Sequence, residues 1–240
     1  MKQLNLCDNF LVTLPEAFTC LSTLSKLELN RNKLISVSQL ETMVHLNWLE
    51  AGNNQFRMMP TEVYQLSNLL ILNLFANNIE EIPEGIEKLT ALQKINLSYN
   101  GLKELPLALG LLTQLKELKL DGNHFQMIPS CIYQILALKE LHLSNCSIRC
   151  IHGDISRLTN LSLINMGCNL LTDIHDNICL LGNLAELDVS HNLLLMLPER
   201  LGDLSRLSDV DLSGNMIEVF PESIGALREI SQFKVSFNRL

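Results

Sequence analysis

Apolar residues return along the chain in one short pattern. Around Asn123, three leucines precede the asparagine and two apolar residues follow it: Leu115, Leu118, Leu120, Phe125 and Ile128. The last two leucines are separated by one residue, and this period of two predicts a short β-strand whose alternate residues face solvent. After it, apolar residues recur at every third position, which predicts a short, tight helical or 3₁₀ segment. These residues are Ile132, Ile135 and Leu138.

Each return of the pattern contains one polar residue at a fixed position, which is called the slot here. The slots are Asn9, Asn32, Asn54, Asn77, Asn100, Asn123, Cys146, Asn169, Asn192, Asn215 and Asn238. They are 23 residues apart, except for a step of 22 residues from Asn32 to Asn54. A unit of this size is too thin to bury its own leucines, so its neighbours must supply the rest of the core. The asparagine amide is expected to bond backbone groups that adjacent units would otherwise leave unsatisfied.

The repeats match the consensus LxxLxLxxNxLxxLPxxLxxL, and the chain therefore resembles the leucine-rich-repeat family over its whole length. The resemblance implies an α/β solenoid: a right-handed horseshoe with a concave parallel sheet and convex 3₁₀, short helical or irregular arms. The segments Leu14-Pro15 and Ile82-Pro83 are similar to the intracellular subclass of Erbin, Scribble and Ras-binding scaffold proteins. The second repeat departs from that subclass, and His152 and His175 replace proline in two later repeats.

The uninterrupted repeat predicts a single domain over residues 1–240, with about ten repeats, a partial last one and no recognisable end caps. Apolar residues in the outermost repeats should then be partly exposed. They are Leu4, Leu6, Phe233, Val235 and Leu240. We expect from this that the chain continues into a longer protein or associates through its ends.

Composition narrows the classes of partner and the compartment. Lys+Arg 18 against Asp+Glu 26 gives a net charge of −8, which disfavours nucleic acid and anionic membranes and favours proteins or basic peptides. No apolar run of about twenty residues occurs, so no membrane insertion is expected. The seven cysteines are odd in number and fall at unrelated repeat positions, which predicts reduced thiols and a cytoplasmic location.

The sequence carries no phosphate-binding glycine loop and no nucleophile elbow, and we predict a protein that is not an enzyme and has no cofactor. The best candidate metal site joins His152 and His175, at equivalent positions of adjacent repeats, with Cys150 nearby. The alternative, which we prefer, is that both histidines are exposed residues filling the place of proline. No metal site is therefore predicted.

The strand residues that face solvent give two candidate partner-binding surfaces. The first, called here the aromatic patch, is formed by Trp48, Ile71, Phe75 and Tyr99. Aromatic side chains on an exposed face are unfavourable in water and are typical anchors of interfaces. The second, called here the acidic cluster, is formed by Glu186, Asp188, Asp209 and Asp211. Like charges on adjacent strands would be relieved by a cationic partner.

Together these features predict an intracellular scaffold or adaptor that binds a protein partner on the concave face, in signalling. A small GTPase, a phosphatase or another signalling protein would be such a partner. Alternatives are an extracellular ligand-sensing ectodomain, and a substrate-recognition or regulatory subunit of a ubiquitin ligase or phosphatase, because a solenoid does not reveal what it is attached to.

Overall fold

The computed structural model describes residues 1–240, which form two compact units, Met1–Lys119 and Leu120–Leu240. Each repeat contributes one strand of three residues. The strands of the first unit are β1 (Gln3–Asn5), β2 (Lys26–Glu28), β3 (Trp48–Glu50), β4 (Ile71–Asn73), β5 (Lys94–Asn96) and β6 (Glu117–Lys119). Those of the second unit are β7 (Glu140–His142), β8 (Leu163–Asn165), β9 (Glu186–Asp188), β10 (Asp209–Asp211) and β11 (Gln232–Lys234). Within each unit, consecutive strands pair in parallel.

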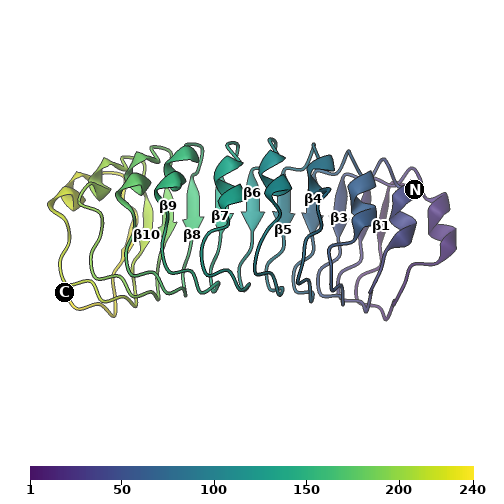
Figure 1. Ribbon diagram of the computed structural model, residues 1–240, viewed down its shortest axis with the longest axis horizontal. Coiled ribbons are helices and arrows are strands. Elements are labelled where there is room, and N and C mark those ends of the chain that lie inside the picture. Colours follow the sequence, from purple (N-terminus) through teal and green to yellow (C-terminus); the bar gives the residue numbers. More distant parts are fainter. The chain divides into compact units, whose positions relative to one another are not determined.

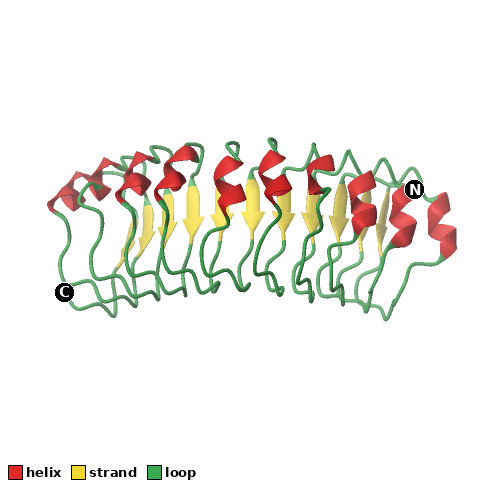
Figure 2. Cartoon of the chain, in the orientation of Figure 1, coloured by secondary structure: helices red, strands yellow, loops and turns green.

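A short 3₁₀ helix lies between each strand and the next, as the three-residue spacing predicts. In the first unit these helices are η1 (Glu16–Cys20), η2 (Ser38–Thr42), η3 (Thr61–Gln65), η4 (Ile86–Lys88) and η5 (Leu107–Leu111). In the second unit they are η6 (Ser130–Gln134), η7 (Gly153–Arg157), η8 (Asp176–Leu180), η9 (Leu201–Asp203) and η10 (Glu222–Ala226). In each unit the strands form one layer and the 3₁₀ helices the opposite one (Figures 1 and 2).

The core lies between these two layers. The central residue of each inner strand points into it, and Leu118 and Leu141 are fully buried. Phe56 and Phe125, two residues after their asparagines, are the largest side chains buried in it. The alternation predicted for Leu118 and Leu120 is confirmed, because both are buried while Glu117 and Lys119 remain partly accessible.

The asparagines form a ladder of hydrogen bonds inside the turns. Asn77 shows the arrangement: its Nδ2 donates to the carbonyls of Leu74 (3.0 Å) and of Ala51 in the preceding repeat (3.1 Å). Its Oδ1 accepts the N–H of Phe56, also in the preceding repeat, at 3.2 Å. An amide in the slot therefore ties its own turn to the repeat before it, as expected from the sequence, whereas Asn9 in the first repeat bonds only its own turn.

The residue before each slot adopts a left-handed backbone conformation, with φ between 50° at Ala76 and 69° at Gly214. This feature was not foreseen, because the position holds glycine in only two repeats and otherwise residues as different as Arg31 and Tyr99. Left-handed φ is disfavoured for side chains with a Cβ. The surrounding hydrogen bonds of each repeat must therefore offset this cost.

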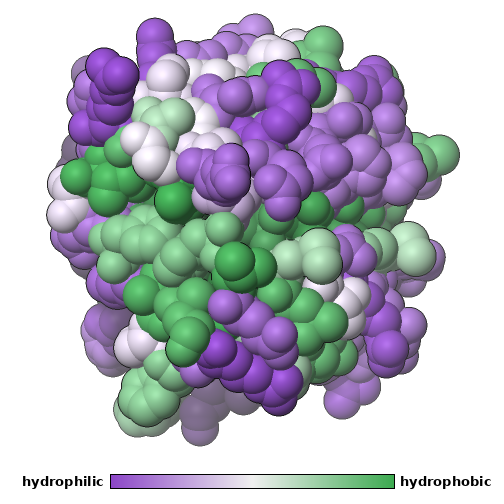
Figure 3. All heavy atoms as spheres, turned by 90° about the vertical axis from the view of Figure 1, so that its left-hand side faces the viewer, coloured by the Kyte–Doolittle hydropathy of each residue, from purple (hydrophilic) through white to green (hydrophobic).

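The outermost repeats are less well covered than the inner ones. Leu4 and Leu6 in the first unit, and Phe233 and Val235 in the second, are half-buried, and Leu240 is exposed. Figure 3 looks onto the C-terminal side of the molecule and shows a broad apolar band between hydrophilic margins. The predicted partial exposure of these residues is therefore confirmed. None of the helical segments combines the length and the apolar character that crossing a bilayer requires.

Candidate binding surfaces on the strand face

Both candidate surfaces lie on the face of the strands that points away from the core. In the inner strands the first and third residues are partly accessible and the second is buried. The parallel register places equivalent residues of neighbouring strands side by side, about 4.8 Å apart. Residues separated by one whole repeat in the sequence therefore form continuous rows on this face.

The aromatic patch is brought together by β3, β4 and the turns that follow β4 and β5. Trp48 and Ile71 are register partners, so their predicted adjacency is confirmed. The rings of Phe75 and Tyr99 pack edge to face, with centroids 5.2 Å apart. Tyr99 is 54% exposed, whereas Trp48, Ile71 and Phe75 are half-buried, so the patch is better covered than the sequence suggested.

Trp48 is covered because neighbouring polar side chains contact it. The Nζ atom of Lys26, on β2, lies 4.7 Å from the centroid of the Trp48 ring, which is a cation–π contact. The indole Nε1 donates a hydrogen bond of 2.9 Å to Oε1 of Glu50.

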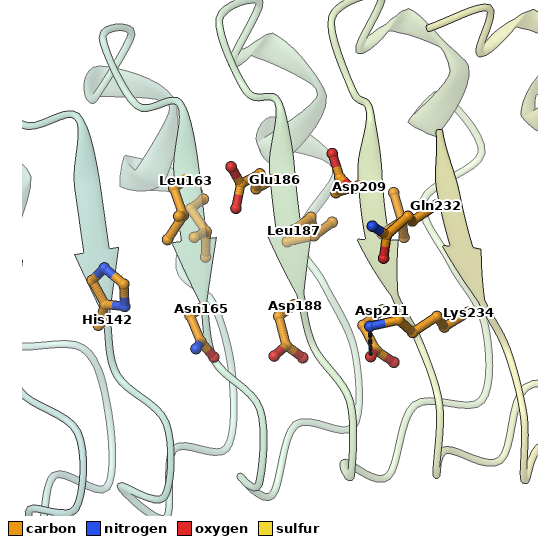
Figure 4. Close-up of a pocket in the computed structure, with 12 residues that line it drawn as sticks. His142, Leu163, Asn165, Glu186, Leu187, Asp188, Asp209, Asp211, Gln232 and Lys234 are labelled. Carbon is orange, nitrogen blue, oxygen red and sulfur yellow. Dashed lines mark ion pairs between the residues drawn. The ribbon is translucent and has the colours of Figure 1, made fainter. Parts of the chain in front are cut away.

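The acidic cluster occupies β9 and β10. Glu186 pairs in register with Asp209, and Asp188 with Asp211, so the predicted adjacency of the four carboxylates is confirmed. They line a shallow recess of about 410 Å³, and Figure 4 shows them in two rows that run across the strands, Glu186 beside Asp209 and Asp188 beside Asp211. Its other lining residues include Leu163, Asn165, His142, Gln232 and Lys234.

One carboxylate of the cluster is paired with a cation. Lys234 Nζ lies 3.4 Å from Asp211 Oδ2, the ion pair drawn in Figure 4. Burial raises the pKa of Asp211, but hydrogen bonds from Ser213 and the Lys234 contact outweigh burial and hold the pKa below its usual value. Glu186, Asp188 and Asp209 have no lysine, arginine or histidine within ion-pair distance. Three carboxylates therefore remain for a cationic partner.

Two carboxylates of the acidic cluster, those of Asp188 and Asp211, also have a structural role that the sequence analysis missed. Asp188 Oδ1 accepts the N–H of Ser190 at 2.9 Å, and Asp211 Oδ1 accepts the N–H of Ser213 at 3.0 Å. Asn165 makes the equivalent bond to Gly167. At the third residue of a strand, a side-chain oxygen thus accepts the N–H two residues further on and stabilises the turn that follows the strand. The sequence did indicate this role, since asparagine occupies the third strand position in several repeats.

His152 and His175 act as caps of the 3₁₀ helices. The Nδ1 atom of His152 accepts the N–H of Asp154 at 3.3 Å, and that of His175 accepts the N–H of Asn177 at 3.1 Å. Their φ angles of −74° and −62° are those that proline adopts at the same place in other repeats. Nowhere in the chain do three histidine, cysteine or acidic side chains gather in a way that could hold a metal ion. The expectation that these histidines take the place of proline is confirmed.

The stacked strands, 3₁₀ arms and asparagine ladder define a leucine-rich-repeat solenoid. Residues 62–196, more than half of the chain, match the family described as "Leucine-rich repeat region". The chain belongs to the leucine-rich-repeat family. No curated protein sequence shows detectable similarity to it.

Several solved structures share this fold. A leucine-rich-repeat protein of Leptospira interrogans has 31% sequence identity and a TM-score of 0.97, and the match covers 99% of this chain and 61% of that one. An internalin from Listeria monocytogenes, at 22% identity and a TM-score of 0.90, covers 99% of this chain and 68% of its own. The ectodomain of the Arabidopsis thaliana receptor kinase GASSHO1/SCHENGEN3, at 29% identity and a TM-score of 0.85, covers 98% of this chain and 30% of its own.

These neighbours widen the range of leucine-rich-repeat proteins that the chain resembles. They are two bacterial proteins and one plant receptor ectodomain, and none of them is a member of the Erbin and Scribble subclass. The chain also spans 61% of the length of the Leptospira protein.

Proposed function

We propose that this chain is a non-catalytic protein-binding module that recognises its partner through the strand face and serves as an intracellular, cytoplasmic scaffold or adaptor in signalling. The observation that carries the proposal is the aromatic patch, in which the half-buried Trp48 lies beside Ile71 and the rings of Phe75 and Tyr99 pack edge to face in the turns that follow. Tryptophan and tyrosine are the residue types most often found as interface hot spots.

The patch predicts which exchanges weaken binding. Replacing Trp48 and Phe75 together with alanine should reduce partner affinity about thirtyfold or more, because one hot-spot aromatic contributes about 2 kcal/mol. The measurement is capture of partners from native lysate by wild type and variant, quantified by mass spectrometry, followed by titration of the partner recovered. A matched control replaces Leu107 and Leu111, which are 73% and 66% exposed on η5 in the opposite layer. Equal capture by wild type and the Trp48/Phe75 variant would show that the patch binds nothing.

The acidic cluster supports a second contact with a basic segment of the same class of partner. Asp209→Asn combined with Asp211→Asn should weaken such binding, and added salt should weaken it in the wild type, because exposed charges are screened. Asparagine keeps the oxygen that accepts the N–H of Ser213, so the strand end stays closed. A control with the same charge change is Asp173→Asn with Asp176→Asn, both exposed on the arms. Salt-insensitive binding, or equal loss in both variants, would argue against an electrostatic role.

Two alternatives remain within protein binding. A receptor ectodomain is favoured by the similarity to the GASSHO1/SCHENGEN3 ectodomain, whose structure was solved in complex with CASPARIAN STRIP INTEGRITY FACTOR 2. Intact mass of the protein from native cells separates the two locations: disulfides, or glycans at the triplets that begin at Asn96, Asn145 and Asn160, would support the ectodomain. A regulatory subunit of a ubiquitin ligase or phosphatase would be recognised by the enzyme recovered with it.

A further inference from the structure

The Trp48 indole is held by a carboxylate on its own strand. Trp48 and Glu50 are the first and third residues of β3, and both side chains lie on the solvent face. Oε1 of Glu50 accepts the indole N–H at 2.9 Å. The second oxygen, Oε2, accepts two hydrogen bonds from neighbouring repeats. One comes from Nδ2 of Asn73, on β4, at 2.6 Å, and the other from Nδ2 of Asn30, just after β2, at 3.4 Å.

Backbone groups decide which way both asparagine amides point. Asn73 Oδ1 accepts the N–H of Phe75 at 3.0 Å, and Asn30 Oδ1 accepts the N–H of Gly52 at 2.7 Å. With both oxygens committed to the backbone, both amide NH₂ groups must face Glu50. Three donors therefore converge on one side chain, and only a carboxylate offers acceptors on both of its terminal atoms.

The Glu50 carboxylate is available to bind Trp48 because another residue accepts the backbone N–H of Gly52. At the third strand position, Asn73 and Asn96 accept the N–H two residues further on. Glu50 does not, and Asn30 of the preceding repeat supplies the oxygen for Gly52 instead. A Cβ at Gly52 would lie 3.2 Å from Asn30 Oδ1 and 3.1 Å from the carbonyl of Phe75, so glycine permits this close approach.

We propose that Glu50 is a positioning residue that fixes the Trp48 ring on the strand face and links it to Phe75 through Asn73. The importance of this for a partner rests on the proposed function, whereas the positioning itself does not. A ring that already donates to Glu50 at its edge and has Lys26 over its face loses little freedom when a partner packs on it. Glu50 would then affect affinity without needing to touch the partner.

The single tryptophan makes the proposal measurable without any partner. In the ¹⁵N-labelled protein it gives one indole N–H resonance. Glu50→Ala should move this resonance towards its position in the urea-unfolded chain, speed its exchange with solvent and increase quenching of Trp48 fluorescence by acrylamide. Glu50→Gln keeps one carbonyl oxygen and should restore the indole signal in part.

The control is Glu117→Ala on β6, which removes another partly buried carboxylate of the same face, with two lysine partners, away from Trp48. An indole resonance, exchange rate and quenching unchanged in Glu50→Ala would overturn the proposal, as would equal changes in Glu117→Ala. If Glu50→Ala fails to fold, the comparison of Glu50→Gln with wild type decides. Should the indole respond as expected while the Trp48/Phe75 variant still captures partners normally, the proposed function fails and the positioning role stands.

Discussion

At the scale of single residues, the slot of each repeat shows what the asparagine contributes. In the one repeat with cysteine, Cys146 Sγ lies 3.3 Å from the Leu120 carbonyl and 3.4 Å from that of Ser144, so sulfur takes the donor role. It does not take the acceptor role. The N–H of the fully buried Phe125 has no hydrogen-bond partner, and Ser147 is forced into a left-handed φ of 61° seen at no equivalent position.

Cys146→Asn should therefore stabilise the protein. The amide oxygen would accept the Phe125 N–H as Asn169 accepts that of Ile148, and one restored hydrogen bond contributes about 0.5–1.5 kcal/mol. The midpoint of urea unfolding at constant m-value is the measurement. Cys131→Asn is the matched control: that cysteine is buried in η6 outside the slot, and an amide there should destabilise. A Cys146→Asn variant no more stable than wild type would mean that the turn has adapted to sulfur.

Sequence reasoning succeeded at this scale where a residue does the same work in every repeat. The inward leucines and the slot asparagines were predictable because each recurs with the same spacing. It failed where one side chain is shared between repeats. The bonds from Asn30 and Asn73 to Glu50 depend on register and amide orientation, which no spacing reveals. The capping by His152 depends on a rotamer and a φ angle, and the sequence showed only that proline was missing.

At the scale of elements, the 3₁₀ helices pack so closely that some positions admit no side chain. A Cβ at Gly202, in η9, would lie 2.0 Å from the carbonyl oxygen of Ser223 in η10. Gly182, in the turn after η8, is unrestricted, because a Cβ there would meet nothing within 4 Å. A glycine of the arms is thus restricted or free according to what the neighbouring repeat places against it.

Gly202→Ala should destabilise by about 1–3 kcal/mol, because the Ser223 backbone must move away. Gly182→Ala should be neutral or stabilise by up to about 1 kcal/mol, since its backbone φ is not left-handed and alanine restricts the unfolded chain. Chemical unfolding of both variants checks the pair. Equal effects of the two exchanges would show that the packing between η9 and η10 does not control stability.

At the scale of the whole molecule, the exposed layers of the outermost repeats are apolar surfaces, separate from the strand face, that could contact another protein. In the second unit Val219, Phe237 and Leu240 are 68%, 86% and 59% exposed, and in the first unit Phe10 is 83% exposed. Exposed apolar side chains gathered on one surface favour association.

We therefore predict that the 240-residue chain self-associates through these layers as its concentration rises. Light scattering over a concentration series measures the apparent mass, and Phe237→Lys with Leu240→Lys should shift association to higher concentration, because a charged side chain opposes burial of that surface. Leu107→Lys with Leu111→Lys adds the same charge to an exposed apolar site on η5, outside these layers, and should change association less. A wild-type chain that stays strictly monomeric throughout the series would show that the exposed layers are too small to hold two copies together.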